Sequence, residues 1–144
     1  MFSQIAIFGV MTNCIFCRIV KGEIPTPKVY EDDNFLAFLD MHPLNRGHTL
    51  VIPKKHVRWV QDVQPFGKYW ETALKVTNGI MNGLKADRVQ YITVGEVVLH
   101  AHIHVVPRYE GDGHPDLPDW SKDKKFTEEE FENTVKVIKE AIKI

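Results

Sequence analysis

The chain has 144 residues, a length that suits one domain of ordinary size. Hydrophobic residues make up 44% of it and charged residues 26%, which is typical of a soluble globular protein. The formal net charge of -1 excludes a general electrostatic attraction to nucleic acid or to an anionic membrane, and no apolar run reaches the length of about 18 residues that a membrane-spanning helix needs.

The first ten residues are apolar, but they lack the basic segment and the small-residue cleavage site of a signal peptide. We therefore predict an N-terminal extension over residues 1–12 and one domain over residues 13–144. Residues 1–10 either precede the folded domain, as after a misassigned start codon, or add an edge strand or a flap to it. With no export signal, we expect the protein in the reducing cytoplasm.

Short elements separated by turns are predicted for the first part of the domain. A helix over residues 17–22 ends at a glycine, and Pro25 and Pro27 then impose an extended backbone. Turn-forming residues at 32–34 and 43–47 divide the following chain into three strands, predicted over residues 29–31, 35–39 and 48–53. Three consecutive strands with short turns predict an antiparallel meander.

From residue 66 the hydrophobic pattern becomes helical. The residues that recur at steps of three and four are Phe66, Tyr69, Trp70, Ala73, Leu74, Thr77, Ile80, Met81 and Leu84. They predict a long amphipathic helix over residues 66–84, in which Gly79 and Gly83 would each cost about 1 kcal/mol relative to alanine. Tyr69, Trp70 and Met81 suit either the core or an interface.

Two further strands are predicted, the second of them ended by Pro107, over residues 89–94 and 100–106. Residues 109–125 are polar and rich in glycine, proline and aspartate, which predicts a loop. Thr127 and Glu130 then form a capping box that opens a C-terminal helix. The order predicts an α+β fold with an antiparallel sheet of about five strands, a long helix and a C-terminal helix.

Three histidines alternate along the last predicted strand. Because successive side chains of a strand point to opposite faces, His100, His102 and His104 should share one face. Ala101 and Ile103 should face the core, so a functional site is favoured over chance histidines on an exposed strand. One metal ion cannot easily hold both outer histidines, since their Cα atoms would lie about 13 Å apart and metal–nitrogen bonds are about 2.1 Å long.

The segment over residues 100–106 has the pattern His-φ-His-φ-His-φ-φ, where φ is hydrophobic, and it resembles the signature of the histidine triad (HIT) family. Four earlier segments resemble the N-terminal half of this family in the same order, at residues 13–17, 29–32, 38–40 and 47–56. Pro107 and Arg108 resemble the segment that follows the triad. The resemblance covers residues 13–108 and implies a HIT-like fold that binds a purine nucleotide such as AMP.

The resemblance also implies a reaction. His102, the middle histidine, would attack the α-phosphorus of a nucleoside phosphoramidate or a dinucleoside polyphosphate, and water would hydrolyse the nucleotidyl-histidine. A neutral imidazole, with a reference pKa of about 6.5, has an unprotonated nitrogen available at pH 7. His104 would contact the phosphate, and His48, a fourth histidine, would support the triad by hydrogen bonds.

For the nucleoside, the resemblance implies that Asp40 accepts hydrogen bonds from the ribose hydroxyls and that Met41 and His42 line the pocket. The alternative for Asp40 is an ordinary turn residue at the end of a strand. Relatives pair as homodimers through the long helix and the strand beside it. We therefore expect a homodimer of this chain.

The spacing of Cys14 and Cys17 suits a metal clip or a redox pair better than a structural disulfide, and no βαβ pattern supports the redox role. Zinc-carrying members of the family resemble this chain at Cys14, Cys17, His56 and His100, which implies a tetrahedral structural zinc site. The alternative is that the two thiols pack as small hydrophobic groups.

One segment departs from the family. Relatives carry a glycine-rich stretch with asparagine and glutamine before the triad, whereas residues 94–99 here are Val-Gly-Glu-Val-Val-Leu. Glu96 would repel a phosphate unless it points away or is protonated. Three hypotheses follow: a nucleotide hydrolase or transferase acting through His102, a nucleotide-binding scaffold with little turnover, and a hydrolase whose zinc is catalytic, which would need an open metal position.

Overall fold

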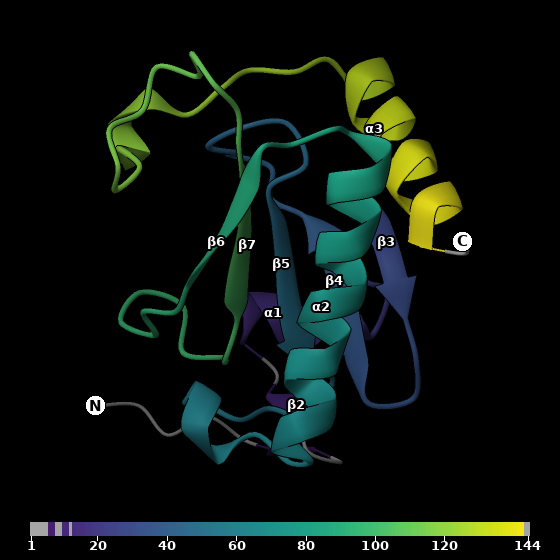
Figure 1. Ribbon diagram of the computed structural model, residues 1–144. Coiled ribbons are helices and arrows are strands. Elements are labelled where there is room, and N and C mark those ends of the chain that lie inside the picture. Colours follow the sequence, from purple (N-terminus) through teal and green to yellow (C-terminus); the bar gives the residue numbers. More distant parts are fainter. Residues whose placement is uncertain (1–5, 8–9, 12, 143–144) are drawn as a thin grey trace.

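The computed structural model of the protein describes residues 6–7, 10–11 and 13–142 and confirms the α+β fold class. A five-stranded antiparallel sheet in the order β3-β4-β5-β7-β6 forms its centre (Figure 1). Its strands are β3 (Lys28–Glu31), β4 (Phe35–Leu39), β5 (Thr49–Pro53), β6 (Arg88–Ile92) and β7 (Ile103–Arg108). The helices are α1 (Ile15–Val20), α2 (Phe66–Gly83) and α3 (Glu128–Ile142), with short 3-10 helices at Val60–Asp62 and Trp120–Lys122.

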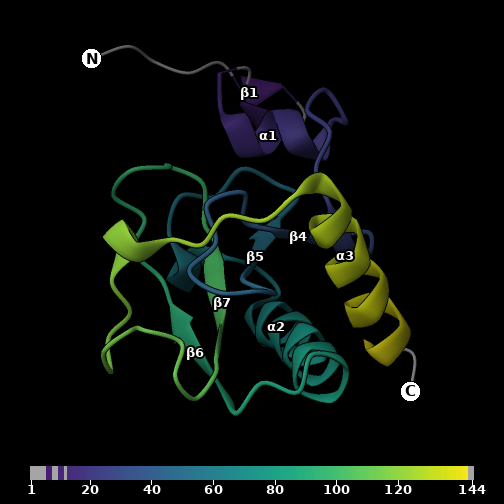
Figure 2. The ribbon, with the colours of Figure 1, turned by 90° about the horizontal axis from the view of Figure 1, so that it is seen from above.

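The sheet is covered on both faces, with α2 on one side and α1 on the other (Figure 2). Alternation along β4 directs Ala37 and Leu39 into the larger core beneath α2 and α3, and Leu36 and Phe38 into a smaller cluster with α1. Every residue of β4 is buried for this reason. The histidines described below lie at the α1 face.

The N-terminal part contains β1 (Ala6–Ile7) and β2 (Val10–Met11), which pair antiparallel in a separate two-stranded sheet. These two strands therefore add no edge strand to the main sheet. The remaining residues of the predicted extension over residues 1–12 lie outside the described part of the chain. No helix within the described residues is long and apolar enough to cross a membrane.

The strand that should carry the three histidines is shorter than predicted. β7 begins at Ile103, so His100 and His102 precede it, and the predicted strand over residues 100–106 is wrong at both ends. The backbone before Ile103 is bonded elsewhere, since Ala101 N–H donates to the Val57 carbonyl. Pro107 does not end the strand; it pairs with Val89 of β6, beyond the last pairing of β7 with β5, where a missing N–H is tolerated.

The predicted helices are confirmed, with shifts at their ends. α1 begins at Ile15 rather than at residue 17, and Gly22 follows it with a φ of 80°. Thr127 caps α3, because its hydroxyl accepts from Glu130 N–H at 3.1 Å. On α2, Phe66 and Leu74 are 43% and 53% exposed, so the buried face is narrower than the predicted one.

Glycines of α2 allow α3 to approach closely. A Cβ built on Gly79 would lie 2.6 Å from Cγ1 of Ile142 and 3.0 Å from the Ile138 carbonyl oxygen. A Cβ on Gly83 would lie 2.9 Å from Cγ1 of Val137. The two glycines that weaken the isolated helix therefore serve its contact with α3.

We predict that Gly79→Ala destabilises the protein by about 1–3 kcal/mol, because overpacking at the contact between α2 and α3 exceeds the gain in helix propensity. Urea denaturation measures this change. Gly67→Ala in the same helix is the matched control, since a Cβ there meets nothing within 4 Å. A neutral or stabilising effect at position 79 would contradict the packing role.

Candidate functional site

Four buried histidines gather at the α1 face of the sheet. His48 and His100 are fully buried, and His102 and His104 are each 8% exposed. His104 lies on β7 opposite Leu50 of β5, a member of the cluster that packs with α1. The ring of Phe16, on α1, lies edge-on to His102 at 5.2 Å between ring centroids. The structure therefore brings the predicted triad and its fourth histidine together.

A hydrogen bond fixes the orientation of His102. Its Nδ1 lies 2.8 Å from the carbonyl oxygen of His100. Because a carbonyl can only accept, Nδ1 carries the proton and the lone pair of the neutral ring lies on Nε2. The residue that the sequence predicts as nucleophile thus has its unprotonated nitrogen on the side of the ring away from this bond.

A second chain of hydrogen bonds sets the tautomer of His104. Leu44 N–H donates to His48 Nδ1 at 3.0 Å, so the proton of neutral His48 lies on Nε2. That nitrogen lies 3.0 Å from His104 Nδ1 and donates to it, which leaves a proton on His104 Nε2. Burial lowers the pKa of His48 to about 3 and that of His104 to about 4, so both rings are neutral at pH 7.

Asp40 lies beside this histidine chain. Its Oδ1 accepts from His42 N–H at 2.9 Å, so it does form the turn that was the alternative to a ligand role. Its Oδ2 lies 3.6 Å from His48 Nε2, which is too long for a hydrogen bond, and neutral His48 offers it no charge. Burial raises the pKa of the Asp40 carboxyl, with the His42 N–H acting in the opposite direction.

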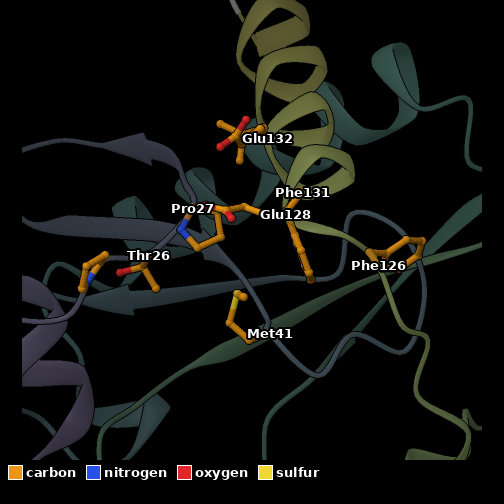
Figure 3. Close-up of a pocket in the computed structure, with 9 residues that line it drawn as sticks. Thr26, Pro27, Met41, Phe126, Glu128, Phe131 and Glu132 are labelled. Carbon is orange, nitrogen blue, oxygen red and sulfur yellow. The ribbon is translucent and has the colours of Figure 1, made fainter.

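The two other residues predicted for the nucleoside lie farther out. Met41 is 53% exposed and faces a groove of about 600 Å³ between α3 and the chain before β3 (Figure 3). The groove is mostly apolar and no histidine lines it; its lining residues include Pro25, Pro27, Phe126 and Phe131. The His42 side chain is 83% exposed, and its Nδ1 lies 3.8 Å from Asp123. The structure thus brings Met41 to a groove and leaves His42 at the surface.

The four predicted metal ligands form one cluster. One ligand atom from each of Cys14, Cys17, His56 and His100 lies within 4.8 Å of the other three. Sγ of Cys14 and of Cys17 lie 3.4 Å and 3.5 Å from His100 Nδ1. His100 Nε2 donates to the Pro53 carbonyl at 2.8 Å, which directs the unprotonated Nδ1 toward the thiols. This donor set fits a tetrahedral divalent ion such as zinc.

Sequence reasoning missed Trp120. This half-exposed ring lies 4.9 Å from the His104 ring and 5.9 Å from that of His48, measured between centroids. It stands in the loop after β7, which buried Arg108 holds by hydrogen bonds to Asp112 and to the carbonyls of residues 114–116. A tryptophan in a stretch rich in glycine, proline and aspartate was the one available signal.

Comparisons with known proteins agree with this geometry. The model of the HIT domain family matches residues 21–111. A solved structure of a hypothetical histidine triad nucleotide-binding protein from Sulfolobus tokodaii is 35% identical, with a TM-score of 0.78 over 90% of this chain and 92% of that one. A zinc-bound histidine triad family protein from Mycobacterium smegmatis is 32% identical, with a TM-score of 0.74 over 91% and 94%.

A plant relative is named for an enzymatic activity. An adenylylsulfatase of Arabidopsis thaliana is 36% identical over 107 residues, which are 69% of this chain and 54% of that protein. The class is therefore that of the HIT domain proteins, whose solved members include one named as nucleotide-binding and others named as hydrolases. The chain belongs to the histidine triad (HIT) family.

We predict that His48 makes the fold less stable in acid. Its pKa is about 3 when folded, whereas the unfolded value is about 6.5, so the unfolded state binds more protons between these pH values. The contribution of neutral His48 to the free energy of unfolding is complete above about pH 6.5 and is lost as the pH falls toward 3. From pH 7 to pH 5 we expect a loss of about 2 kcal/mol from His48, measured by urea denaturation.

The matched variant is His48→Asn, which keeps an acceptor for Leu44 N–H but does not titrate. Its stability should depend less on pH over this range. If the stability of the variant depends on pH as strongly as that of the native chain, then His48 is not the group that takes up a proton on unfolding.

Proposed function

We propose that the protein is a nucleotide hydrolase or transferase that cleaves the α-phosphorus bond of nucleoside phosphoramidates or dinucleoside polyphosphates through a nucleotidyl-histidine intermediate. The observation that carries the proposal is the bond from His102 Nδ1 to the His100 carbonyl, which leaves the lone pair of Nε2 for attack. The plant relative is named an adenylylsulfatase, which is the name for an enzyme that cleaves an adenylyl group from sulfate. That reaction is of the same kind as the one proposed here.

The proposed reaction has two steps. The lone pair of His102 Nε2 forms a bond to the α-phosphorus, and the bond to the leaving group breaks with its electron pair, which takes up a proton from solvent when the leaving group is an amine. Water then attacks the phosphorus and loses a proton to solvent, and the phosphorus–nitrogen bond breaks with its electron pair returning to Nε2, so that the products are a nucleoside monophosphate and neutral His102. His104 Nε2–H, positioned through His48, would donate to a phosphoryl oxygen in both steps.

The nucleotide that we propose is a purine nucleotide such as AMP. Asp40, partly buried beside the histidine chain, would accept from the ribose hydroxyls through its Oδ2 atom. Met41 follows it directly and would contact the nucleoside from the edge of the apolar groove, with His42 as a more distant contact. A structural metal at the cysteine pair requires reduced thiols, which suits the cytoplasm.

A nucleotide-binding scaffold with little turnover is the second candidate. The segment before the triad favours it, because residues 94–99 offer no hydroxyl or amide side chain and Val97 is 91% exposed. Phosphate contacts from side chains of this segment are therefore missing. Turnover distinguishes the two candidates.

We also propose a homodimer. Phe66, Leu74 and Tyr91 are exposed apolar residues on α2 and on the neighbouring edge strand β6. Tyr69 is not available for this contact, since it is fully buried and donates to the Val51 carbonyl. Light scattering measures the mass in solution, where we expect a dimer for the native chain and a monomer for Leu74→Arg. A native chain that has the mass of a monomer, equal to that of the variant, would contradict the proposal.

The first prediction for the function concerns adenosine phosphoramidate. The native chain should release AMP from it, and His102→Ala should lower kcat by more than about 1000-fold while AMP binding is retained. Chromatography of the products and calorimetry of AMP binding measure the two effects. Turnover that survives the substitution would remove His102 as nucleophile, and tight AMP binding without any turnover would favour the scaffold.

The second prediction concerns zinc, which we propose as a structural ion held by Cys14, Cys17, His56 and His100. Four protein ligands leave no open position for a catalytic water. Cys17→Ser should lose most of the metal and unfold at lower urea concentration, as measured by elemental analysis and denaturation. His102→Ala is the control and should keep its metal; equal metal content in both variants would contradict this site.

A further inference from the structure

A small cleft adjoins the nucleophile on the side of residues 93–95. Its volume is about 80 Å³, and His102, Arg58 and Gly95 are among the residues that line it. Neither Asp40 nor Met41 belongs to it, so it is separate from the proposed nucleoside contacts. Among the described residues that line the cleft, Arg58 is the one member of the set aspartate, glutamate, lysine and arginine.

The chain holds Arg58 at this position through its neighbours. The Val57 carbonyl accepts from Ala101 N–H at 2.6 Å, which ties the segment before Arg58 to the residue that precedes the nucleophile. The Arg58 guanidinium lies over the ring of Trp59, with Cζ at 4.2 Å from the centroid. Gly95 packs against the same ring, because a Cβ there would lie 3.0 Å from it.

Glu96 partly neutralises the charge of this guanidinium, but an anionic ligand can displace the Glu96 carboxylate. Nη2 of Arg58 lies 4.0 Å from a Glu96 carboxylate oxygen, and the two side chains are 41% and 67% exposed. An exposed ion pair at this distance is weak. A phosphate or sulfate group can accept two parallel hydrogen bonds from a guanidinium, which is a stronger arrangement. An anionic ligand can therefore replace Glu96 as the partner of Arg58.

We propose that Arg58 binds the anionic leaving group of the substrate and makes the site prefer polyphosphate or sulfate leaving groups to amines. The inference rests on the proposed function. It assigns to Arg58 the recognition of negative charge that the side chains of residues 94–99 do not supply. Glu96 then lowers the affinity for the same anion by competing for the guanidinium.

Binding to the inactive His102→Ala chain tests this without turnover, with AMP and ATP as probes in calorimetry. The further substitution Arg58→Ala should weaken ATP binding about 10-fold or more and change AMP binding less than about 3-fold. Glu96→Gln should act in the opposite direction and tighten ATP binding. Arg88→Ala is the matched control, since it removes an exposed arginine of β6 with the same charge.

Loss of the ATP preference in Arg58→Ala but not in Arg88→Ala supports the inference. If both variants lose ATP affinity equally, or if neither loses any, the inference is overturned. The proposed function is unaffected by that result as long as the chain binds AMP. Failure of the His102→Ala chain to bind AMP removes the proposed function and this inference together. In the active chain, Arg58→Ala should lower kcat/KM for adenylyl sulfate at least 10-fold more than for adenosine phosphoramidate, and equal losses for the two substrates contradict the specificity role.

Discussion

The hydrogen bond from His100 Nε2 to the Pro53 carbonyl is the constraint on which both functional clusters depend. It turns the unprotonated Nδ1 of His100 toward the two cysteines, which is the orientation that a metal ligand needs. The carbonyl of the same residue accepts from His102 Nδ1 and so sets the tautomer of the proposed nucleophile. A metal bound at the cysteines would therefore hold the residue that orients the reactive imidazole, although it would take no part in the chemistry.

The hydrogen-bond chain from Leu44 to His104 works because His48 and His104 are neutral. Burial disfavours the charged form of His48 and His104, so each ring carries a single proton whose position is set by the hydrogen bond at its other nitrogen. Leu44 N–H at one end of the chain decides where every following proton lies, so an ordinary backbone group determines that His104 donates from Nε2. In the small cleft beside His102, Arg58 supplies a guanidinium, so we assign the recognition of negative charge to that residue.

The sheet supports this site from the opposite face. α2 and α3 pack on the side away from α1, and the glycines of α2 allow the two helices to lie close together. Arg108 follows the triad on β7 and anchors the loop that carries Trp120 back to the histidines. The continuous segment over residues 100–108 thus connects the cluster of cysteines and histidines, the proposed nucleophile and the loop that borders the site.

The sequence alone determined the fold class, the long helix, the alternating histidines and the cysteine pair, because hydrophobic periodicity and residue spacing are local properties that the chain carries in any conformation. The addition of His48 and His56 to these clusters came from the resemblance to the HIT family. The sequence misplaced the start of β7 and the role of Pro107, since both depend on which backbone groups Val57 and Val89 offer. It missed Trp120, and it gave no role to Arg58, which lies 44 positions before His102 in the printed sequence. Only the tertiary structure decided the tautomers and these neighbours, because hydrogen-bond partners and burial arise from contacts between distant segments.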